Sequence, residues 1–460
     1  MDARNMDGWD VLSLVTISFV NTAIRVQGSS PTDMQVLTDT LAVQAEFGIW
    51  QVTVGGSGNI LMFNIPLTNM TGNVTKHGQP ITQFDYASLS ARVQLSLKFV
   101  GGGSTGQKLV LDSKSPPTTV DWLVDGDGQQ LSDVLDDAFI KEALTTWLSN
   151  NLSQFDHVFA SVDLDLSDTS DARWAFCKPS VVAHTYISGS SLTNSYLGLM
   201  YNTAGKTTPG SVAQIDPSFI PAGCQSSFMI SPSLFLADFL APAARQQFNI
   251  PSQLFDVDTS QLTATLVAGA QVAMASVSTS HGTYQPHMTD LQLSIENSII
   301  TTYAKTSTKV LDKWYGTVTA FNVSQSWMTL GLDSSGQSLV WTSTQSPINN
   351  HYTEQSRGFT VIQDILEAVG IFVLVVATVL TDGAALLVVG ALVGVAQGGF
   401  QWALSDMESR NVNDAPGIND LVSNITLPAQ WTSAGPFVVS KAGLYLGGFF
   451  LAGTLRSTAP

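Results

Sequence analysis

The sequence has little charge and few basic residues. Only 12% of its 460 residues are Asp, Glu, Lys or Arg, about half of the usual ~25%. Nineteen Lys and Arg stand against 36 Asp and Glu, which gives a formal net charge of −17. Nucleic-acid binding and electrostatic docking on anionic lipid both require basic patches. The composition therefore predicts no nucleic-acid partner, and the 44% of apolar residues argues against a disordered chain.

Cysteine is almost absent. Cys177 and Cys224 are the two cysteines of the chain, and they do not provide a disulfide framework or a four-ligand zinc site. Whether they pair is left open by the sequence. A secretory leader is also not readable, because Asp2 and Asp7 are acidic and no apolar segment follows them without interruption by Ser or Thr. We expect a protein that is secreted or released by another route and is cytoplasmic before release.

Patterns that mark catalytic centres are missing as well. Gly101–Lys108 approaches a phosphate-binding loop, but the lysine is one residue late and Leu109 replaces the magnesium-binding hydroxyl residue. The six histidines form no HExxH or i, i+4 pair, and there is no GxSxG motif. His157 and His184 lie on strand-like segments and are interpreted as polar-face residues. We expect a protein that is not an enzyme and has no metal or cofactor. The sequence leaves open whether it binds a lipid.

Period-two alternation dominates the first two thirds of the chain. Ala91–Phe99 alternates apolar and polar residues without a break, and 158–166 and 291–295 repeat the pattern. Strands with one apolar and one polar face are typical of antiparallel sheets. Two hairpins are predicted, one around the loop 55–59 and one around the loop 333–336.

Helical spacing occurs at two places. Leu131–Asn150 has apolar residues at i, i+3, i+4, i+7 and i+8, and Ser231–Phe248 begins with a capping serine followed by proline. The fold class is therefore α+β. We divide the chain into residues 1–250, a β-rich lobe with helices, and residues 251–460, a lobe with strands and an apolar helical hairpin at 361–405.

The apolar tract of the second lobe is the strongest candidate for function. Residues 368–381 and 383–405 contain no charge and are separated by Asp382. Their length and near-continuous apolarity predict two helices joined by a turn at 381–383. Three interpretations remain open, of which the first is favoured: a buried core hairpin, a helix pair lining a lipid-holding groove, and a membrane-inserting hairpin. The candidate lipid- or membrane-contacting residues are Ile371, Phe372, Leu374, Val375, Leu380, Leu386, Leu387, Val388, Leu392 and Val395.

Several non-catalytic stretches resemble the clostridial P-47/OrfX family, whose members are encoded beside certain neurotoxin genes and in insecticidal loci. The stretches are Gly8-Trp9-Asp10, Val20–Ile24, Phe155–Leu164, Ala213–Pro217 and Phe228–Pro232. That family is similar to the tubular lipid-binding (TULIP) superfamily. The resemblance implies curved antiparallel sheets wrapped around long helices in an elongated molecule, with an apolar groove that can hold lipid. It also implies a secreted bacterial protein and supplies no catalytic residue.

These observations lead to one main functional hypothesis and two alternatives. The main hypothesis is a non-enzymatic lipid- or membrane-interacting protein of a bacterial toxin system, either a toxin accessory or an insecticidal component. The first alternative is a membrane-inserting, pore-forming insecticidal toxin that uses the hairpin at 368–405. The second is a scaffold that binds other proteins of the same toxin locus, with its acidic surface facing basic partners.

Overall fold

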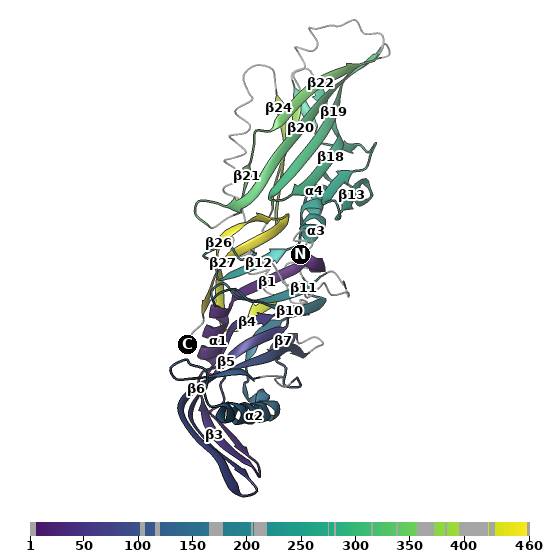
Figure 1. The fold of residues 1–460 in the computed structure, drawn as a ribbon. Helices are drawn as coiled ribbons and strands as arrows, with labels where there is room; N and C mark the ends of the chain where they lie inside the picture. The colour runs from purple at the N-terminus through teal and green to yellow at the C-terminus, as the bar shows by residue number, and fades with distance from the viewer. Residues whose placement is uncertain are drawn as a thin grey trace. The chain divides into compact units, whose positions relative to one another are not determined.

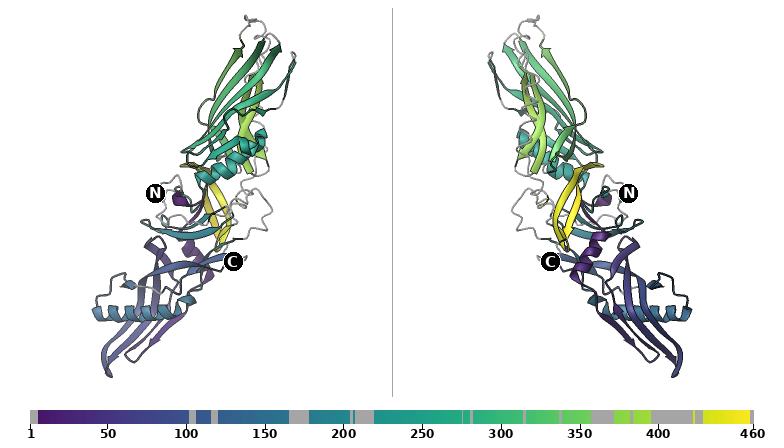
Figure 2. Two further views of the ribbon diagram at one scale, coloured as in Figure 1. Left: turned by 90° about the vertical axis from the view of Figure 1, so that its right-hand side faces the viewer. Right: turned by 90° about the vertical axis from the view of Figure 1, so that its left-hand side faces the viewer.

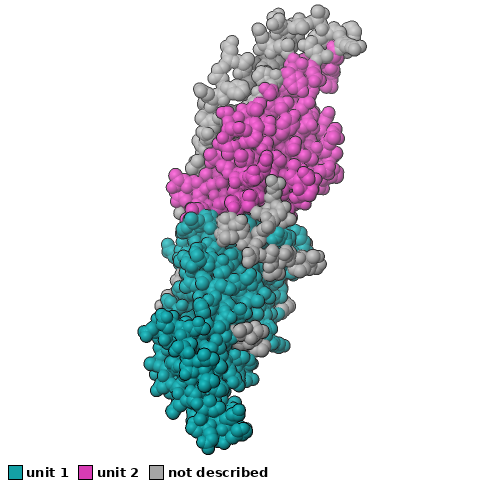
Figure 3. Space-filling view, viewed as in Figure 1, with its two compact units in different colours: residues 1–228, 425–438, 452–460 teal, residues 229–424, 439–451 magenta. Residues whose placement is uncertain are grey.

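The computed structural model forms two compact units (Figures 1 and 3). Unit 1 comprises residues 1–228, 425–438 and 452–460, and unit 2 comprises residues 229–424 and 439–451. The sequence predicts a boundary near residue 250 with all later residues in the second lobe, whereas residues 425–438 and 452–460 belong to unit 1 in the structure. The structure describes residues 6–101, 106–115, 120–164, 178–203, 206, 219–274, 276–279, 282–313, 316–336, 339–356, 372–381, 384–394, 422 and 428–457.

Unit 1 is built mainly from antiparallel strands. Two long neighbours, β5 and β6, pair along most of their length, because both alternate apolar and polar residues. Its elements are η1 (Met6–Gly8), β1 (Val11–Thr16), α1 (Ile17–Gln27), β2 (Asp33–Leu37), β3 (Leu41–Phe47), β4 (Gln51–Ser57), β5 (Ile60–Lys76), β6 (Gln79–Gly101), β7 (Gln107–Leu111), β8 (Val120–Asp125), α2 (Val134–Asn151), η3 (Leu152–Gln154), β9 (Val158–Val162), β10 (Val181–Ile187), β11 (Tyr196–Asn202) and β25 (Ala429–Trp431). The residues of three further strands are divided between the two units; these strands are β12 (Ser226–Ile230), β26 (Ala434–Tyr445) and β27 (Gly448–Ser457).

The larger sheet of unit 1 has nine strands in the order β2-β3-β5-β6-β7-β9-β25, with β4 paired to β5 and β8 paired to β6. This sheet curls around α2 (Figure 1). The buried face of α2 consists largely of Ile140, Ala143, Leu144, Trp147 and Leu148. The Trp147 ring lies 4.7 Å from that of Phe47 on β3. Side chains from the helix therefore pack directly against the concave side of the sheet.

Polar contacts fix the start of α2 against β6. Asp133 caps the helix by accepting hydrogen bonds from the backbone N–H groups of Leu135 and Asp136. The Asp136 carboxylate accepts hydrogen bonds from Thr82 Oγ1 at 3.0 Å and Tyr86 Oη at 2.9 Å. Burial and the neighbouring Asp136 raise the pKa of Tyr86 to about 12, which keeps this hydroxyl a donor at neutral pH.

A second sheet of six strands has the order β10-β11-β1-β12-β27-β26. The strands β1, β11 and β12 are buried along their whole length. Ser226 Oγ satisfies part of this buried backbone by donating to the Leu14 carbonyl oxygen at 2.8 Å. Strands covered on both faces read as apolar runs rather than as alternating patterns, which is the pattern of β1.

Unit 2 starts with the helical run predicted at 231–248. Ser231 Oγ accepts a hydrogen bond from the Leu234 N–H and Pro232 occupies the first turn, as the sequence predicted. The run contains α3 (Pro232–Leu234), a π-helical segment (η7, Phe235–Leu240) and α4 (Ala241–Phe248). The π-helical segment precedes Pro242, whose missing N–H and ring interrupt regular α-helix.

The strands of unit 2 form an antiparallel sheet in the order β13-β14-β18-β19-β20-β21, with β15 paired to β18 and β22 paired to β20. The second predicted hairpin is confirmed as β20–β21. The remaining elements are η8 (Ser252–Leu254), β13 (Phe255–Asp258), β14 (Thr263–Leu266), β15 (Val272–Ala273), β16 (Val277–Thr279), β17 (Gly282–Tyr284), β18 (Pro286–Glu296), β19 (Ile299–Lys313), β20 (Gly316–Leu332), β21 (Leu339–Ser343), β22 (Ile348–Gln355), β23 (Phe372–Thr381) and β24 (Ala384–Gly394).

The prediction of an apolar helical hairpin at 361–405 is wrong for the residues that the structure describes. Residues 372–381 and 384–394 form two antiparallel strands instead. The tract is rich in β-branched valine, which favours strands. Asp382-Gly383 is a dipeptide typical of two-residue hairpin connections. The rest of the predicted hairpin lies outside the described residues.

Candidate functional site: an apolar hairpin on a polar sheet face

The hairpin of β23 and β24 contains most of the candidate contact residues. Its strands have 10 and 11 residues and no charged side chain. Thr381 pairs with Ala384 at the turn, and Phe372 pairs with Gly394 at the opposite end. On β23 lie Phe372, Leu374, Val375 and Leu380, and on β24 lie Leu386, Leu387, Val388 and Leu392; Ile371 and Val395 lie outside the described residues.

Register places these candidates on both faces of the hairpin. Leu374 is paired with Leu392, so these two lie on one face, whereas Val375 is paired with Ala391 on the other. A shift in register occurs near Ala377. Both faces are therefore apolar in sequence, unlike a strand that has one face in water.

Within the described part of the chain, β23 and β24 pair with each other and with no third strand. In unit 2, β23 lies beside β19 and β20, and both hairpin strands lie near α4. Figure 2 shows the light-green hairpin alongside the darker green strands. The backbone of the hairpin thus lies beside the larger sheet without joining its hydrogen-bonded strand order.

The side of β19 and β20 that is buried is unusually polar. Register puts Thr302 opposite Ser326, Ala304 opposite Ser324 and Thr306 opposite Asn322. We call the buried hydroxyl and amide residues of these two strands the polar face; they are Thr302, Thr306, Thr308, Asn322, Ser324 and Ser326. Because β23 lies beside these strands, we infer that the apolar hairpin covers the polar face.

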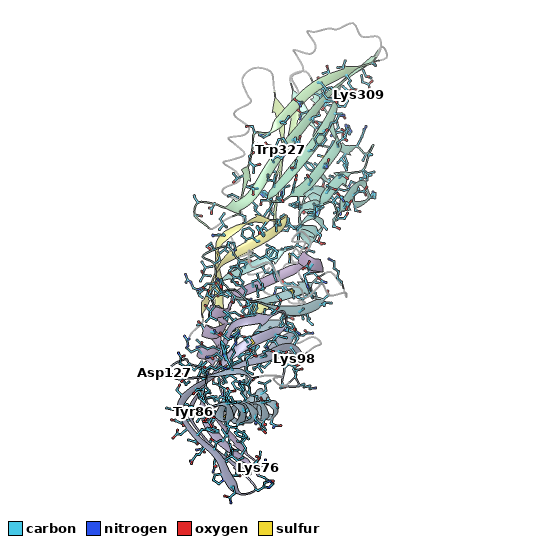
Figure 4. All side chains as sticks on the ribbon, in the orientation of Figure 1. Lys76, Tyr86, Lys98, Asp127, Lys309 and Trp327 are labelled. Carbon is cyan, nitrogen blue, oxygen red and sulfur yellow. The ribbon has the colours of Figure 1, made fainter. Side chains whose placement is uncertain are left out.

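The neighbouring strand and the opposite side of the sheet show that this polarity is local. On β18 the buried residues are Pro286, Met288, Leu291, Leu293 and Ile295. The outward side of β20 and β22 carries Phe321 and Tyr352, whose rings stack with centroids 5.0 Å apart. Figure 4 labels Trp327, which also lies on this outward side of β20. The polar face is therefore confined to the middle of β20, at residues 322–326, and buried apolar residues flank it on the same side of the strand: Val318, Ala320, Met328 and Leu330.

One hydroxyl of the polar face is poorly satisfied. Thr302 is 4% exposed, and its Oγ1 atom has no hydrogen-bond partner among the described residues. A buried hydroxyl without a partner costs about 1–3 kcal/mol relative to one that is hydrated. Covering the polar face with an apolar hairpin therefore costs the free energy of burying an unpaired hydroxyl. Covering an apolar face would not carry this cost.

Comparison with known proteins places the chain in a family. The family model described as "OrfX-like: Protein OrfX2/OrfX3/P47" matches residues 6–453. The chain belongs to the OrfX-like family. A protein named OrfX3 from Paraclostridium bifermentans is 25% identical over 481 residues, with 96% of this chain and 97% of that protein covered. An OrfX3 protein from Clostridium botulinum (strain Kyoto / Type A2) is 26% identical, with 97% and 98% covered.

Solved structures agree with this OrfX-like assignment at the level of the fold. The structure of P47 from Clostridium botulinum A2 matches with a TM-score of 0.71 and 16% identity, covering 98% of each chain. P47 of Clostridium botulinum E1 matches with a TM-score of 0.69 and 16% identity, covering 98% of this chain and 99% of that one. The expected α+β fold with curved antiparallel sheets is confirmed.

Two histidines of this OrfX-like chain differ from their interpretation as polar-face residues. His157, in the loop before β9, and His184, on β10, are both buried. The rings of Trp50 and Phe159 lie against His157, and the ring of Phe99 lies against His184. Burial lowers the pKa of each to about 4. Each Nε2 atom lacks a hydrogen-bond partner among the described residues. Both side chains are therefore neutral at pH 7.

His157 is part of a buried cluster that supports packing. Its Nδ1 atom lies 3.3 Å from Ser29 Oγ, which also accepts a hydrogen bond from Trp50 Nε1 at 3.3 Å. The rings of Phe155 and Phe159 pack edge-on against Trp50. Although serine and histidine are adjacent, all of these side chains are buried, so a substrate has no access to the pair.

Three other observations bear on the site. Cys224 is buried, and Cys177 lies outside the described residues. In the described ranges no cluster of three or more His, Cys, Asp or Glu residues could hold a metal ion. Among the helices that the structure describes, none combines the length and apolarity needed to cross a membrane.

Proposed function

We propose that this OrfX-like protein is a non-enzymatic, lipid- or membrane-interacting component of a bacterial toxin system, and that the β23–β24 hairpin is the element that contacts lipid. The observation that carries the proposal is an uncharged apolar hairpin placed on a polar sheet face. Two roles agree with the family resemblance: that of a toxin accessory and that of an insecticidal component. Secretion or release from the cell and contact with other proteins of the same locus are further parts of this proposal.

The apolar hairpin can supply membrane affinity without basic residues. Burying a Val, Leu, Ile, Phe or Met side chain contributes about 1.5–3 kcal/mol, so four such side chains contribute roughly 6–12 kcal/mol before the costs of association. The net charge of −17 opposes adsorption on anionic lipid. We therefore expect binding to neutral phosphatidylcholine vesicles that persists at high salt.

Vesicle flotation of the full chain tests this proposal. The variant Val388→Arg places a charge in the hairpin, and Val438→Arg makes the same exchange at a side chain on β26 that is 41% exposed. A charged residue in hydrocarbon costs about 2.5–3.5 kcal/mol, so flotation of Val388→Arg should fall about 100-fold, while Val438→Arg should float like the wild type. Circular dichroism and thermal unfolding check that both variants fold. Unchanged flotation of folded Val388→Arg refutes the assignment of the hairpin.

A further inference from the structure

We propose that the β23–β24 hairpin leaves the polar face and enters the bilayer, where its outer edges pair with the hairpins of further copies of this chain. This inference rests on the proposed function, because it requires that the hairpin contacts lipid. It adds the route by which the hairpin becomes available and identifies its protein partner as a second copy.

Exposure of the polar face on release costs less free energy than exposure of the apolar residues that flank it on β20, such as Val318 and Met328. Water can hydrate Ser324, Ser326 and Thr302, including the Oγ1 atom of Thr302 that lacks a partner in the closed state. If β19 and β20 presented leucine and valine here, release would expose a large apolar surface. The polar face thus lowers the free-energy difference between the covered and uncovered states of the sheet.

The dimensions of the hairpin fit a bilayer. Strands of 10 and 11 residues extend about 33–37 Å at ~3.3 Å per residue, and the hydrocarbon layer is about 30 Å thick. Apolar residues predominate on both faces of the hairpin, so neither face depends on contact with water. Thr378 and Thr381 are the hydroxyl residues of the two strands, and Thr381 lies beside the turn.

The edges of the hairpin determine its partner. The outer edges of β23 and β24 have no strand beside them in the described structure. Water can hydrate the backbone N–H and C=O groups of these edges outside the bilayer but not within its hydrocarbon layer. In hydrocarbon every backbone N–H and C=O must be paired within protein. The same hairpin on a second copy offers matching length and composition, and pairing edge to edge satisfies these groups.

The test varies the polar face and leaves the hairpin unchanged. Thr302→Val/Thr308→Val removes two buried hydroxyls from β19 with little change in shape, and Thr301→Val/Thr319→Val makes the same exchanges at half-buried positions on the outward side. Dye release from phosphatidylcholine vesicles is measured for both, with thermal unfolding as a check of folding. We expect release about tenfold slower for the inner variant and unchanged for the outer one.

The dependence of dye release on the amount of bound protein tests the pairing of copies. Release that rises more steeply than in proportion to bound protein, together with cross-linked oligomers that appear only with vesicles, supports edge-to-edge assembly. Equal release rates of the inner variant and the wild type overturn the release step, and strictly proportional release without oligomers overturns the assembly step. If the wild type floats and Val388→Arg does not, either failure leaves the proposed lipid contact intact.

Discussion

The two buried histidines of unit 1 make its stability depend on pH below neutrality. Burial lowers the pKa of His157 and of His184 to about 4 from the ordinary value of 6.5. The unfolded chain therefore binds protons at these sites at a higher pH than the folded chain does. Their effect on stability is absent above about pH 6.5, and stability is lost as the pH falls from there towards 4.

The size of the effect follows from these values. Each histidine costs about 2 kcal/mol of unfolding free energy at pH 5 and up to about 3 kcal/mol below pH 4, since one pKa unit corresponds to ~1.4 kcal/mol. Together they remove about 4 kcal/mol between pH 7 and pH 5, a large share of the ~5–15 kcal/mol of a typical domain. Carboxylates add their own pH dependence, so the measurement must compare variants.

We therefore compare the wild type with His157→Gln/His184→Gln, which cannot titrate in this range. Urea unfolding at pH 7 and pH 5 is followed by hydrogen exchange of peptides from β9 and β10, so that the signal comes from unit 1. The variant should be less stable at pH 7 because it loses packing, but it should lose about 4 kcal/mol less between the two pH values. His77→Asn at the exposed turn after β5 is the control. An equal loss in the variant and the wild type refutes the reasoning.

Two further predictions concern packing in unit 1. Asp133→Ala removes the side chain that caps α2 and should lower the unfolding free energy by about 1 kcal/mol in urea titrations, whereas Asp133→Asn should remain close to the wild type. A Cβ at Gly72 would lie 2.0 Å from Cζ of Phe84, so Gly72→Ala should cost about 1–3 kcal/mol and lower the melting temperature. Gly331→Ala, where no described atom lies within 4 Å of the new Cβ, should have a much smaller effect, and equal shifts at the two positions would contradict this packing argument.

The elements with regular periodicity could be predicted from the sequence. Ala91–Phe99 lies within β6, and the helical spacing from Leu131 led to α2, which begins at Val134. Local chemistry decides these cases, because alternation or i, i+3, i+4 spacing leaves one arrangement that buries the apolar residues. The capping serine at 231 is a similar case, since its hydroxyl acts within three residues.

The candidate site could be located but its secondary structure could not be derived from apolarity. A run without polar residues has no periodicity, so helix and strand bury it equally well. The valines and the Asp382-Gly383 dipeptide were the signals that favour a strand hairpin. The polar face could not be predicted from the sequence. Alternation along β20 assigns Phe321 and Asn322 to opposite faces without showing which face is covered.

The histidines illustrate the same limit. Alternation identified the side of the strand on which His184 lies, but not the ring of Phe99 from β6, 6.1 Å away, that helps to cover it. Burial of a second face depends on strands that are distant in sequence. Such contacts follow from topology, which single-sequence patterns do not specify.

The assembly of unit 1 from both ends of the sequence has a consequence for its synthesis on the ribosome. Trp431 Nε1 donates to Ser13 Oγ at 3.0 Å, and Gln225 N–H donates to the Gly453 carbonyl oxygen at 2.8 Å. The strand β27 lies between β12 and β26 in its sheet. The first 228 residues must therefore wait, with one edge of β12 unpaired, until about 230 later residues have been made. A nascent chain that ends before residue 448 would present that edge to chaperones, proteases and other nascent chains.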